Sequence, residues 1–295
     1  MNVIKRTFGF IHQHPLGKKH LVKAYSRFIY WQIKSRLNPN LHEVPFLENV
    51  KFLAKRGLTG VTGNIYTGLH EFNDMGFLLH FLRNEDTFYD VGANVGSYTL
   101  LASGVCRSKT IAFEPVPATC SILKNNIKLN RLENLVTIEN KGVGSKDGEL
   151  YFTNSEDTTN HIVLEEPKEQ NTILVPVVNL DQYYPTSKPS LIKIDVEGFE
   201  TEVLNGMDKS LKDPILKAII IELNGSGMRY GYNEDKIHEK LIELDFKPYE
   251  YDPFTRELNI MKRYGSLNTI YARDIDYVLE RVKKANHFKI FNQLI

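Results

Sequence analysis

Cysteine is scarce in this chain of 295 residues, which contains only Cys106 and Cys120, and the two do not form a C-x-x-C pair. Two thiols at this spacing provide no disulfide framework and are typical of a reducing compartment. The formal net charge is only +1, which argues against a general nucleic-acid-binding protein. We therefore expect a cytoplasmic protein without a nucleic-acid partner.

Long apolar runs and repeats are also absent. No run approaches the roughly 18 apolar residues of a membrane span, and Met1 to His14 lacks the apolar centre of a signal peptide. Proline and glycine are not enriched, and no internal repeat or low-complexity tract occurs. Hydrophobic residues make up 42% of the chain, enough for one large core with a small appended region.

The stretch from Thr87 to Pro115 is the most informative part of the sequence. It is typical of a strand, a glycine turn, a short helix and a second strand. Asp90 lies in the first strand, and Gly92 and Gly96 allow the tight turn and close backbone approach that follow it. Glu114 ends the second strand, about twenty residues further on, which is the geometry of a nucleotide-type site on a parallel sheet.

The charges around this turn indicate which ligand it suits. A dinucleotide turn, G-x-G-x-x-G, needs glycine where this chain has Asn94 and Ser97, and Asp90 would repel a pyrophosphate. S-adenosylmethionine carries an ammonium and a sulfonium and no phosphate, and Glu114 could accept hydrogen bonds from its ribose hydroxyls. The alternative is a flavodoxin-like or other α/β domain with a chance acidic turn. The predicted cofactor residues are Asp90, Gly92, Asn94, Gly96, Glu114, Pro115, Gly142 and Asp195.

Three runs of this sequence resemble a known family. The runs YDVGANVGSYTLLAS, AFEPVPATCSILKNNIKLN and LIKIDVEGFETEVLNGM are similar to the hallmark blocks of the FkbM-type methyltransferases, and the resemblance extends over roughly Gly57 to Arg273. It implies use of S-adenosylmethionine and methylation of hydroxyls on sugars or related natural products. It also implies a class I Rossmann-like three-layer α/β fold, with a mostly parallel seven-stranded sheet that ends in an antiparallel hairpin.

A fourth core strand, Leu191 to Ile194, would deliver Asp195 to the carboxyl edge of the sheet, where ligands bind in such folds. Asp195 is the first candidate for removing the acceptor's proton, and Glu197 and Glu200 either contact ligand or cap the next helix. Alternatively Asp195, Glu197 and Glu222 bind Mg²⁺. A neutral histidine is a further option, and His70 and His161 occupy suitable segments.

Two glycine-containing loops at strand ends are further binding candidates. The turn Asn140 to Gly144 could contact the adenine edge through backbone groups, or could simply lead into the next strand. Glu222 and Asn224 precede Gly225, and we expect both side chains to contact the acceptor.

The first 56 residues form a basic helical extension. Met1 to Arg36 contains eight lysines and arginines and no acidic residue, and its apolar residues recur at helical spacing. This amphipathic helix either docks on the catalytic domain or lies on an anionic membrane surface, which would make the protein peripheral at the inner face of the membrane. A second helix is predicted over Phe46 to Lys55.

Residues 57–83 are predicted to link the extension to the catalytic domain, residues 84–273, and to cover the acceptor. Tyr66, His70 and Glu71 form a polar cluster there, ahead of a helix over Phe77 to Leu82; the alternative is a surface turn with Asn73 or Asp74 as helix cap. The polar loop Asn154 to Asn171 could also order over the acceptor. Residues 274–295 are predicted to form a peripheral helical tail.

Three classes of function remain on the sequence alone. The leading one is O-methylation of a sugar hydroxyl in a surface glycan or a glycosylated metabolite. The second is methylation of nitrogen or of a protein, and the third is a catalytically silent module that binds S-adenosylmethionine. The run DVEGFE stands where many N-methyltransferases have an N/D-P-P-Y/F motif, and Asp90, Glu114 and Asp195 are all present, so both alternatives are disfavoured.

Overall fold

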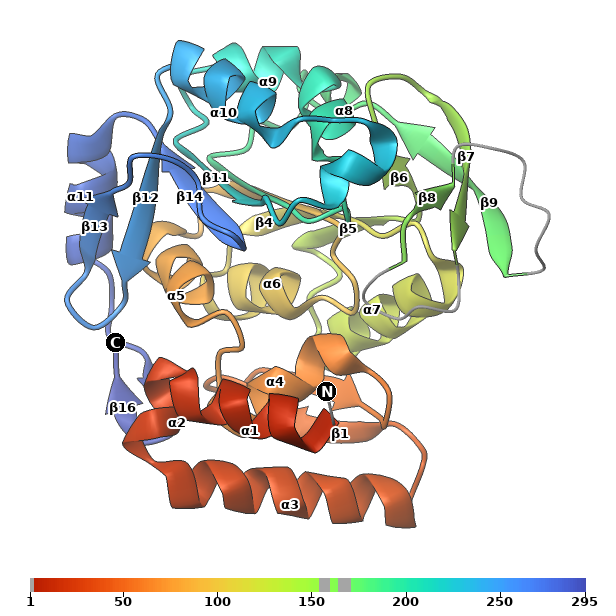
Figure 1. The fold of residues 1–295 in the computed structure, drawn as a ribbon. Helices are drawn as coiled ribbons and strands as arrows, with labels where there is room; N and C mark the ends of the chain where they lie inside the picture. The colour runs from red at the N-terminus through yellow and green to blue at the C-terminus, as the bar shows by residue number, and fades with distance from the viewer. Residues whose placement is uncertain (1–2, 154–159, 164–170) are drawn as a thin grey trace.

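The protein has a central sheet with helices on both faces and an additional helical layer from the N-terminus (Figure 1). The computed structural model describes residues 3–153, 160–163 and 171–295. The predicted loop Asn154 to Asn171 therefore lies largely outside the described residues. None of the helices in the described ranges combines the length and the hydropathy of a membrane span.

The main sheet has eight strands in the order β13-β12-β14-β11-β10-β3-β4-β5. The five strands from β11 to β5 are parallel to one another, and the other three run antiparallel to their neighbours. The strands are β3 (Thr87–Val91), β4 (Lys109–Phe113), β5 (Val136–Glu139), β10 (Leu191–Ile194), β11 (Ala218–Glu222), β12 (Lys247–Asp252), β13 (Glu257–Ile260) and β14 (Asn268–Ala272). This arrangement confirms the predicted class I α/β fold.

One detail of the predicted sheet is wrong, because it has eight strands where seven are expected. The additional strand, β13, lies between β12 and β14 in the chain. Its residues are largely exposed and none of them is buried. The strand pairs only with β12, at the edge of the sheet. An exposed edge strand has no buried face, and therefore it lacks the apolar alternation by which a strand is recognised.

Each face of the sheet is covered by helices that bury an apolar surface. One face packs against α8 (Glu200–Asn205), α9 (Asp208–Lys212) and α10 (Glu234–Glu243). The other packs against α5 (Phe72–Phe81), α6 (Ser97–Thr99) with the π-helical turn Leu100–Val105, α7 (Pro117–Leu129) and α11 (Ile275–Lys283). Since β10 and β11 are buried on both faces, they appear in the sequence as nearly continuous apolar runs.

A second, smaller sheet stands beside the end of α8. Its order is β6-β9-β7-β8, formed by β6 (Gly142–Val143), β7 (Gly148–Thr153), β8 (Ile162–Val163) and β9 (Thr172–Val178). Phe152, Ile162 and Val175 pack with Phe199 into a separate apolar cluster. This sheet places Gly142 and Val143 near the carboxyl edge of the main sheet.

The N-terminal residues form the third helical layer, below the sheet domain in Figure 1. It contains α1 (Val3–Gln13), α2 (Pro15–Lys19), α3 (Leu21–Leu37) and α4 (Thr59–Thr67). Ile11, Ala24 and Trp31 are buried in one cluster with Leu123 and Ile127 of α7. The amphipathic helix predicted within Met1 to Arg36 therefore packs through one of its faces inside the N-terminal layer, against α1, α2 and α4.

The helix predicted over Phe46 to Lys55 is wrong. The chain instead forms a hairpin of β1 (His42–Pro45) and β2 (Lys51–Ala54), in which Phe52 and Ala54 are buried and Lys51 is exposed. Alternation over so few residues cannot be told from a helical pattern without the partner strand. The side chains of Asn126 and Asn130 accept hydrogen bonds from the backbone N–H groups of β2 and so attach the hairpin to α7.

Two further boundaries differ from the prediction. The segment 57–83 is largely helical: α4 contains Gly60 and Gly63, and α5 begins at Phe72 and not at the predicted Phe77, with Glu71 as its N-cap in place of Asn73 or Asp74. The tail after residue 274 begins as the predicted helix, α11, but ends in a pair of short strands, β15 (Lys289–Ile290) and β16 (Gln293–Leu294). It is not peripheral, because Val278 and Val282 lie in the main core.

Candidate active site

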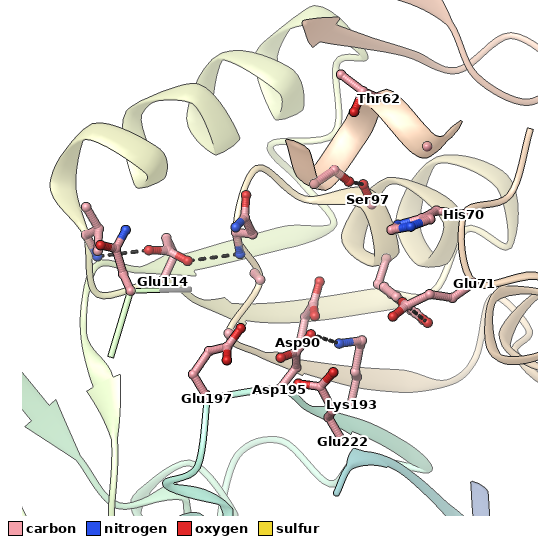
Figure 2. Close-up of a pocket in the computed structure, with 18 of the residues that line it drawn as sticks. Thr62, His70, Glu71, Asp90, Ser97, Glu114, Lys193, Asp195, Glu197 and Glu222 are labelled. Carbon is pink, nitrogen blue, oxygen red and sulfur yellow. Dashed lines mark hydrogen bonds and ion pairs between the residues drawn. The ribbon is translucent and has the colours of Figure 1, made fainter. Parts of the chain in front are cut away.

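A cavity of about 840 Å³ lies at the carboxyl ends of β3, β4, β10 and β11. The sheet edge forms one wall of the cavity, and side chains from α1, α3 and α4 form the opposite wall. Figure 2 shows that the carboxylates of Asp90, Asp195, Glu197 and Glu222 gather at the sheet edge, with Glu114 beside the glycine turn. The three hallmark runs of the sequence therefore meet in one place.

The glycine turn after β3 approaches the end of β10 very closely. Gly92 has φ +82°, and a Cβ atom there would lie 1.8 Å from the carbonyl oxygen of Asp195. Asn94 also has a left-handed backbone, with φ +51°, and both of these predicted cofactor residues line the cavity. Gly96 does not line it: this residue begins α6 with φ +94°, and a Cβ there would meet the side chain of Leu123. Its role is in the turn and not in a ligand contact.

Glu114 holds the glycine turn in place from the neighbouring strand. Its Oε2 accepts a hydrogen bond from the backbone N–H of Asn94 at 2.9 Å, and its Oε1 accepts one from Val116 at 2.9 Å. Burial raises the pKa of Glu114 to about 7, against the lowering effect of these two bonds. Pro115 and Gly142, both predicted to bind the cofactor, line the cavity next to it.

Asp90 is buried and holds α6, the helix that follows the glycine turn. Its Oδ2 accepts hydrogen bonds from both the N–H and the hydroxyl of Thr99, at 3.0 and 2.6 Å. Burial raises the pKa of Asp90 to about 6, and the nearby Lys193 opposes that shift. Asp90 lines the cavity, so it can act on a ligand as well as on the helix.

Lys193 is the central cation of the site. Its side chain is only 4% exposed, and Nζ donates a hydrogen bond to Oδ2 of Asp195 at 2.7 Å. Burial lowers the pKa of Lys193, but the carboxylates of Asp195, Glu71 and Asp90 outweigh that effect and raise it. Nζ also lies 4.8 Å from the ring centroid of Tyr98. Lys193 therefore remains charged and fixes the direction of the Asp195 carboxylate.

The predicted acceptor-side residues Tyr66, His70 and Glu71 all line the cavity. Glu71 accepts hydrogen bonds from the hydroxyl of Tyr98 at 2.7 Å and from the amide of Asn268 at 2.8 Å. The hydroxyl of Tyr66 accepts one from Gln32 of α3. The ring of His70 packs edge-on against Phe10 of α1, and it fills the space that a Cβ on Gly63 would need. Helices of the N-terminal layer thus position Tyr66 and His70, whereas Glu71 is held by residues of α6 and β14.

Three of the other candidates lie elsewhere. Asn224 does not line the cavity, because its side chain turns back to accept a hydrogen bond from the N–H of Ser226. Glu200 accepts from the N–H groups of Val196 and Gly198, so it holds the turn before α8, while the N-cap of that helix is Phe199. His161 is not among the lining residues either. The expectation that Asn224 contacts the acceptor is therefore not met by this geometry.

The model of the methyltransferase FkbM domain matches residues 90–251 of this chain. The chain belongs to the FkbM methyltransferase family. It is 29% identical over 152 residues to the hexuronic acid methyltransferase AglP of Haloferax volcanii, over 50% of this chain and 59% of AglP. It is 32% identical over 164 residues to Methyltransferase 1 of Beauveria bassiana, over 47% of this chain and 65% of that protein. The chain thus spans about three fifths of the length of these relatives.

Among solved structures, a methyltransferase FkbM from Methylobacillus flagellatus aligns with a TM-score of 0.44 at 17% identity, over 65% of this chain and 44% of that one. The residues that match the FkbM family model supply the sheet edge of the cavity. The opposite wall, with α1, α3 and α4, lies N-terminal to the matched residues. Family membership therefore accounts for the residues of the sheet edge and not for those of the opposite wall.

The residues of this FkbM family member fit S-adenosylmethionine. Each carboxylate oxygen of Glu114 accepts one hydrogen bond from the backbone, and each can accept a second one from a ribose hydroxyl. Asp90 and Asp195 add negative charge around the turn, which suits an ammonium and a sulfonium. The close approach of Gly92 to β10 leaves backbone groups at the cavity surface.

The same residues do not fit Mg²⁺. One carboxylate oxygen from each of Asp195, Glu197 and Glu222 lies within 4.8 Å of the others, which is the predicted set. However, Lys193 Nζ is hydrogen-bonded to Asp195, so a buried cation already neutralises the carboxylate that would lead the coordination. A divalent ion beside an ammonium group would suffer strong repulsion at this burial.

Lys193 and Tyr98 are site residues that sequence reasoning missed. Lys193 breaks an otherwise apolar strand, and it faces Asp90 in the parallel register of β3 and β10. A charged residue inside a buried strand was the available signal, because such a charge is retained only where it is paired. Tyr98 gave no such signal, since its position follows from the path of α6 toward Glu71.

Proposed function

We propose that this protein is an S-adenosylmethionine-dependent methyltransferase that methylates a hydroxyl group of a sugar. The observation that carries the proposal is the meeting of the family's three runs in one cavity, with Glu114 at the glycine turn and the carboxylates of Asp195 and Glu222 facing it across the sheet edge. When bound, S-adenosylmethionine supplies an activated methyl group on its sulfonium. The chain's own residues must bind it, position the acceptor and take up a proton.

Asp195 and Glu222 act as a pair that takes up the acceptor's proton. Burial and the charge of Asp195 raise the pKa of Glu222 above its ordinary value, so the two neighbouring carboxylates readily share one proton. Lys193 holds the Asp195 carboxylate through its hydrogen bond. A hydroxyl placed against this pair would lose its proton to it as its oxygen takes the methyl group, the methyl C–S bond breaks and S-adenosylhomocysteine leaves. Removal of this proton contributes roughly 10² to 10⁴ in rate.

The acceptor-side wall favours an acidic sugar. Arg6, Arg36 and Arg56 all line the cavity on the side of α1, α3 and β2, away from the acidic sheet edge. Guanidinium groups suit carboxylate or phosphate on an acceptor. The name of the relative AglP, a hexuronic acid methyltransferase, agrees with an acidic sugar as the acceptor class. We expect transfer to uronic-acid-containing oligosaccharides to exceed transfer to the corresponding neutral ones.

Cofactor binding is tested by calorimetry with S-adenosylmethionine and, separately, with NADH. Glu114→Gln should weaken S-adenosylmethionine binding by about 1 to 3 kcal/mol, since the lost hydrogen bonds go to a charged acceptor. Glu149→Gln is the matched control, because Glu149 is exposed on β7 and does not line the cavity. Binding of NADH in place of S-adenosylmethionine would refute the proposal.

The proton step is tested separately by activity. Glu222→Gln should lower kcat by about 10² to 10⁴ while cofactor affinity is retained. Asp195→Asn should lower kcat by a similar factor and also weaken S-adenosylmethionine binding, because it removes a negative charge beside the cofactor's cationic groups. Glu149→Gln, at an exposed position of β7, should leave kcat unchanged. EDTA should have no effect. Loss of activity in EDTA that Mg²⁺ restores would show that the assignment of Lys193 as the local counter-charge is wrong.

A further inference from the structure

Helix α3 has two apolar faces, and only one of them packs against the protein. Ala24, Trp31 and Ser35 are buried on the inner face. The opposite face exposes a row of large apolar side chains, which we call the outer stripe. Its members and their exposed fractions are Val22 (80%), Ile29 (54%), Tyr30 (64%), Ile33 (56%) and Leu37 (82%).

The outer stripe is a continuous feature of the helix surface. Its residues recur at intervals of three, four and seven, so they lie along one side of the 17-residue helix, opposite the packed face. Single exposed apolar residues are ordinary, but a contiguous row marks an interaction site. Figure 1 shows α3 along the outer edge of the molecule, with α1, α2 and α4 between it and the sheet domain.

The surroundings of the outer stripe are cationic. Lys23 and Lys34 flank it on one side, and Arg36 flanks it on the other, as the helical spacing of these positions requires. No aspartate or glutamate precedes Glu43 in the sequence, so the whole N-terminal layer up to that point carries only positive charge. We therefore expect the partner of this face to offer an apolar layer to the outer stripe and negative charge to the cationic side chains that flank it.

We propose that α3 is an interfacial helix by which the protein binds the surface of an anionic membrane, with the outer stripe inserted between the headgroups. An apolar row bordered by lysine and arginine is the pattern of helices that lie in the plane of such an interface. A second copy of this chain is a poorer occupant, because a two-fold contact through α3 would place the cations of one copy against those of the other.

The inner face of α3 also contributes to the candidate active site. Phe28, Trp31 and Gln32 on that side line the cavity, so the helix that contacts lipid also forms one wall of the site. Membrane binding would hold this wall close to the headgroup layer. This inference does not depend on the identity of the acceptor, and binding to vesicles is measured without any methyl transfer.

The test is flotation of the full-length protein with vesicles of phosphatidylcholine, alone or mixed with phosphatidylglycerol. The wild type should float with the anionic vesicles, and the double variant Ile29→Glu/Ile33→Glu should bind them about 10- to 100-fold more weakly. Lys23→Gln/Lys34→Gln should weaken binding about tenfold and reduce its dependence on salt. The matched control is Ile260→Glu, because Ile260 is 65% exposed on the distant edge strand β13. This control should bind as the wild type does.

Thermal unfolding of each variant shows whether the fold is retained, and α3's exposed positions should tolerate these changes. Equal flotation of the wild type and the stripe variant would overturn the proposal, as would absence of the wild type from anionic vesicles. Sedimentation velocity supplies a further check. A dimer that the stripe substitutions dissociate, without any vesicle binding, would assign the outer stripe to self-association and overturn the membrane assignment.

Discussion

Replacing Lys193 by methionine removes the only charge that the buried end of β10 presents to the surrounding carboxylates, while keeping the aliphatic part of the side chain. Lys193 is 4% exposed and its partner Asp195 is 30% exposed, at 2.7 Å. Breaking a buried ion pair by removing one partner costs about 3 to 5 kcal/mol, and the partial exposure of Asp195 places the expected loss at the lower end, about 3 kcal/mol.

The size of this loss should depend on pH. Burial raises the pKa of Asp90 in the folded protein to about 6. Protonated Asp90 therefore stabilises the fold at pH values below the pKa of Asp90 in the unfolded chain, and this stabilisation is lost as the pH rises through about 6. Lys193 opposes that shift, and its removal raises the pKa of Asp90 further. Lys193→Met should therefore be more destabilising at about pH 8 than at about pH 5, by on the order of 1 kcal/mol.

Urea denaturation followed by circular dichroism at the two pH values measures both effects. The matched control is Lys141→Met, because Lys141 pairs with Glu139 at 2.7 Å but is 36% exposed, and it should cost less than about 1 kcal/mol at either pH. A loss in Lys193→Met as small as that of the control, or one that is the same at both pH values, would refute the assignment of Lys193 as the buried counter-charge.

Two further predictions concern the glycine turn and a second buried acid. Gly92→Ala should lower the free energy of unfolding by about 3 kcal/mol or more, because its Cβ would meet the carbonyl oxygen of Asp195 at 1.8 Å and its φ is +82°; Gly148→Ala, with nothing within 4 Å, should leave the melting temperature nearly unchanged. Burial, with the charge of Glu71, raises the pKa of Asp74 to about 7, so its stabilising protonated form is lost as the pH rises through that value. Asp74→Asn should thus stabilise the protein by about 1 to 3 kcal/mol near pH 8 and by less near pH 5 in thermal melts, and equal effects at both would contradict the raised pKa.

The sequence by itself determined the sheet edge of the site. Asp90, Glu114 and Asp195 could be placed at strand ends because each follows a short apolar run, and because Gly92 can adopt the left-handed backbone that a tight turn at that point requires. These signals are local, since they depend on the conformational range of a few neighbouring residues. Parallel strands then bring their carboxyl ends to one edge whatever the rest of the chain does.

The opposite wall and the internal charge balance were decided only by the tertiary structure. The hairpin at residues 42–54 exists because its two strands pair and dock on α7. Strands of four residues are too short to show a recognisable hydrophobic period in the sequence. Lys193 has its role because the register of β10 on β3 sets it beside Asp90, and the direction of Asn224 depends on the turn at Ser226. Which side of α3 lines the cavity follows only from the packing of the helix in the folded protein. Each of these outcomes depends on contacts between residues far apart in the chain, and a local pattern does not contain them.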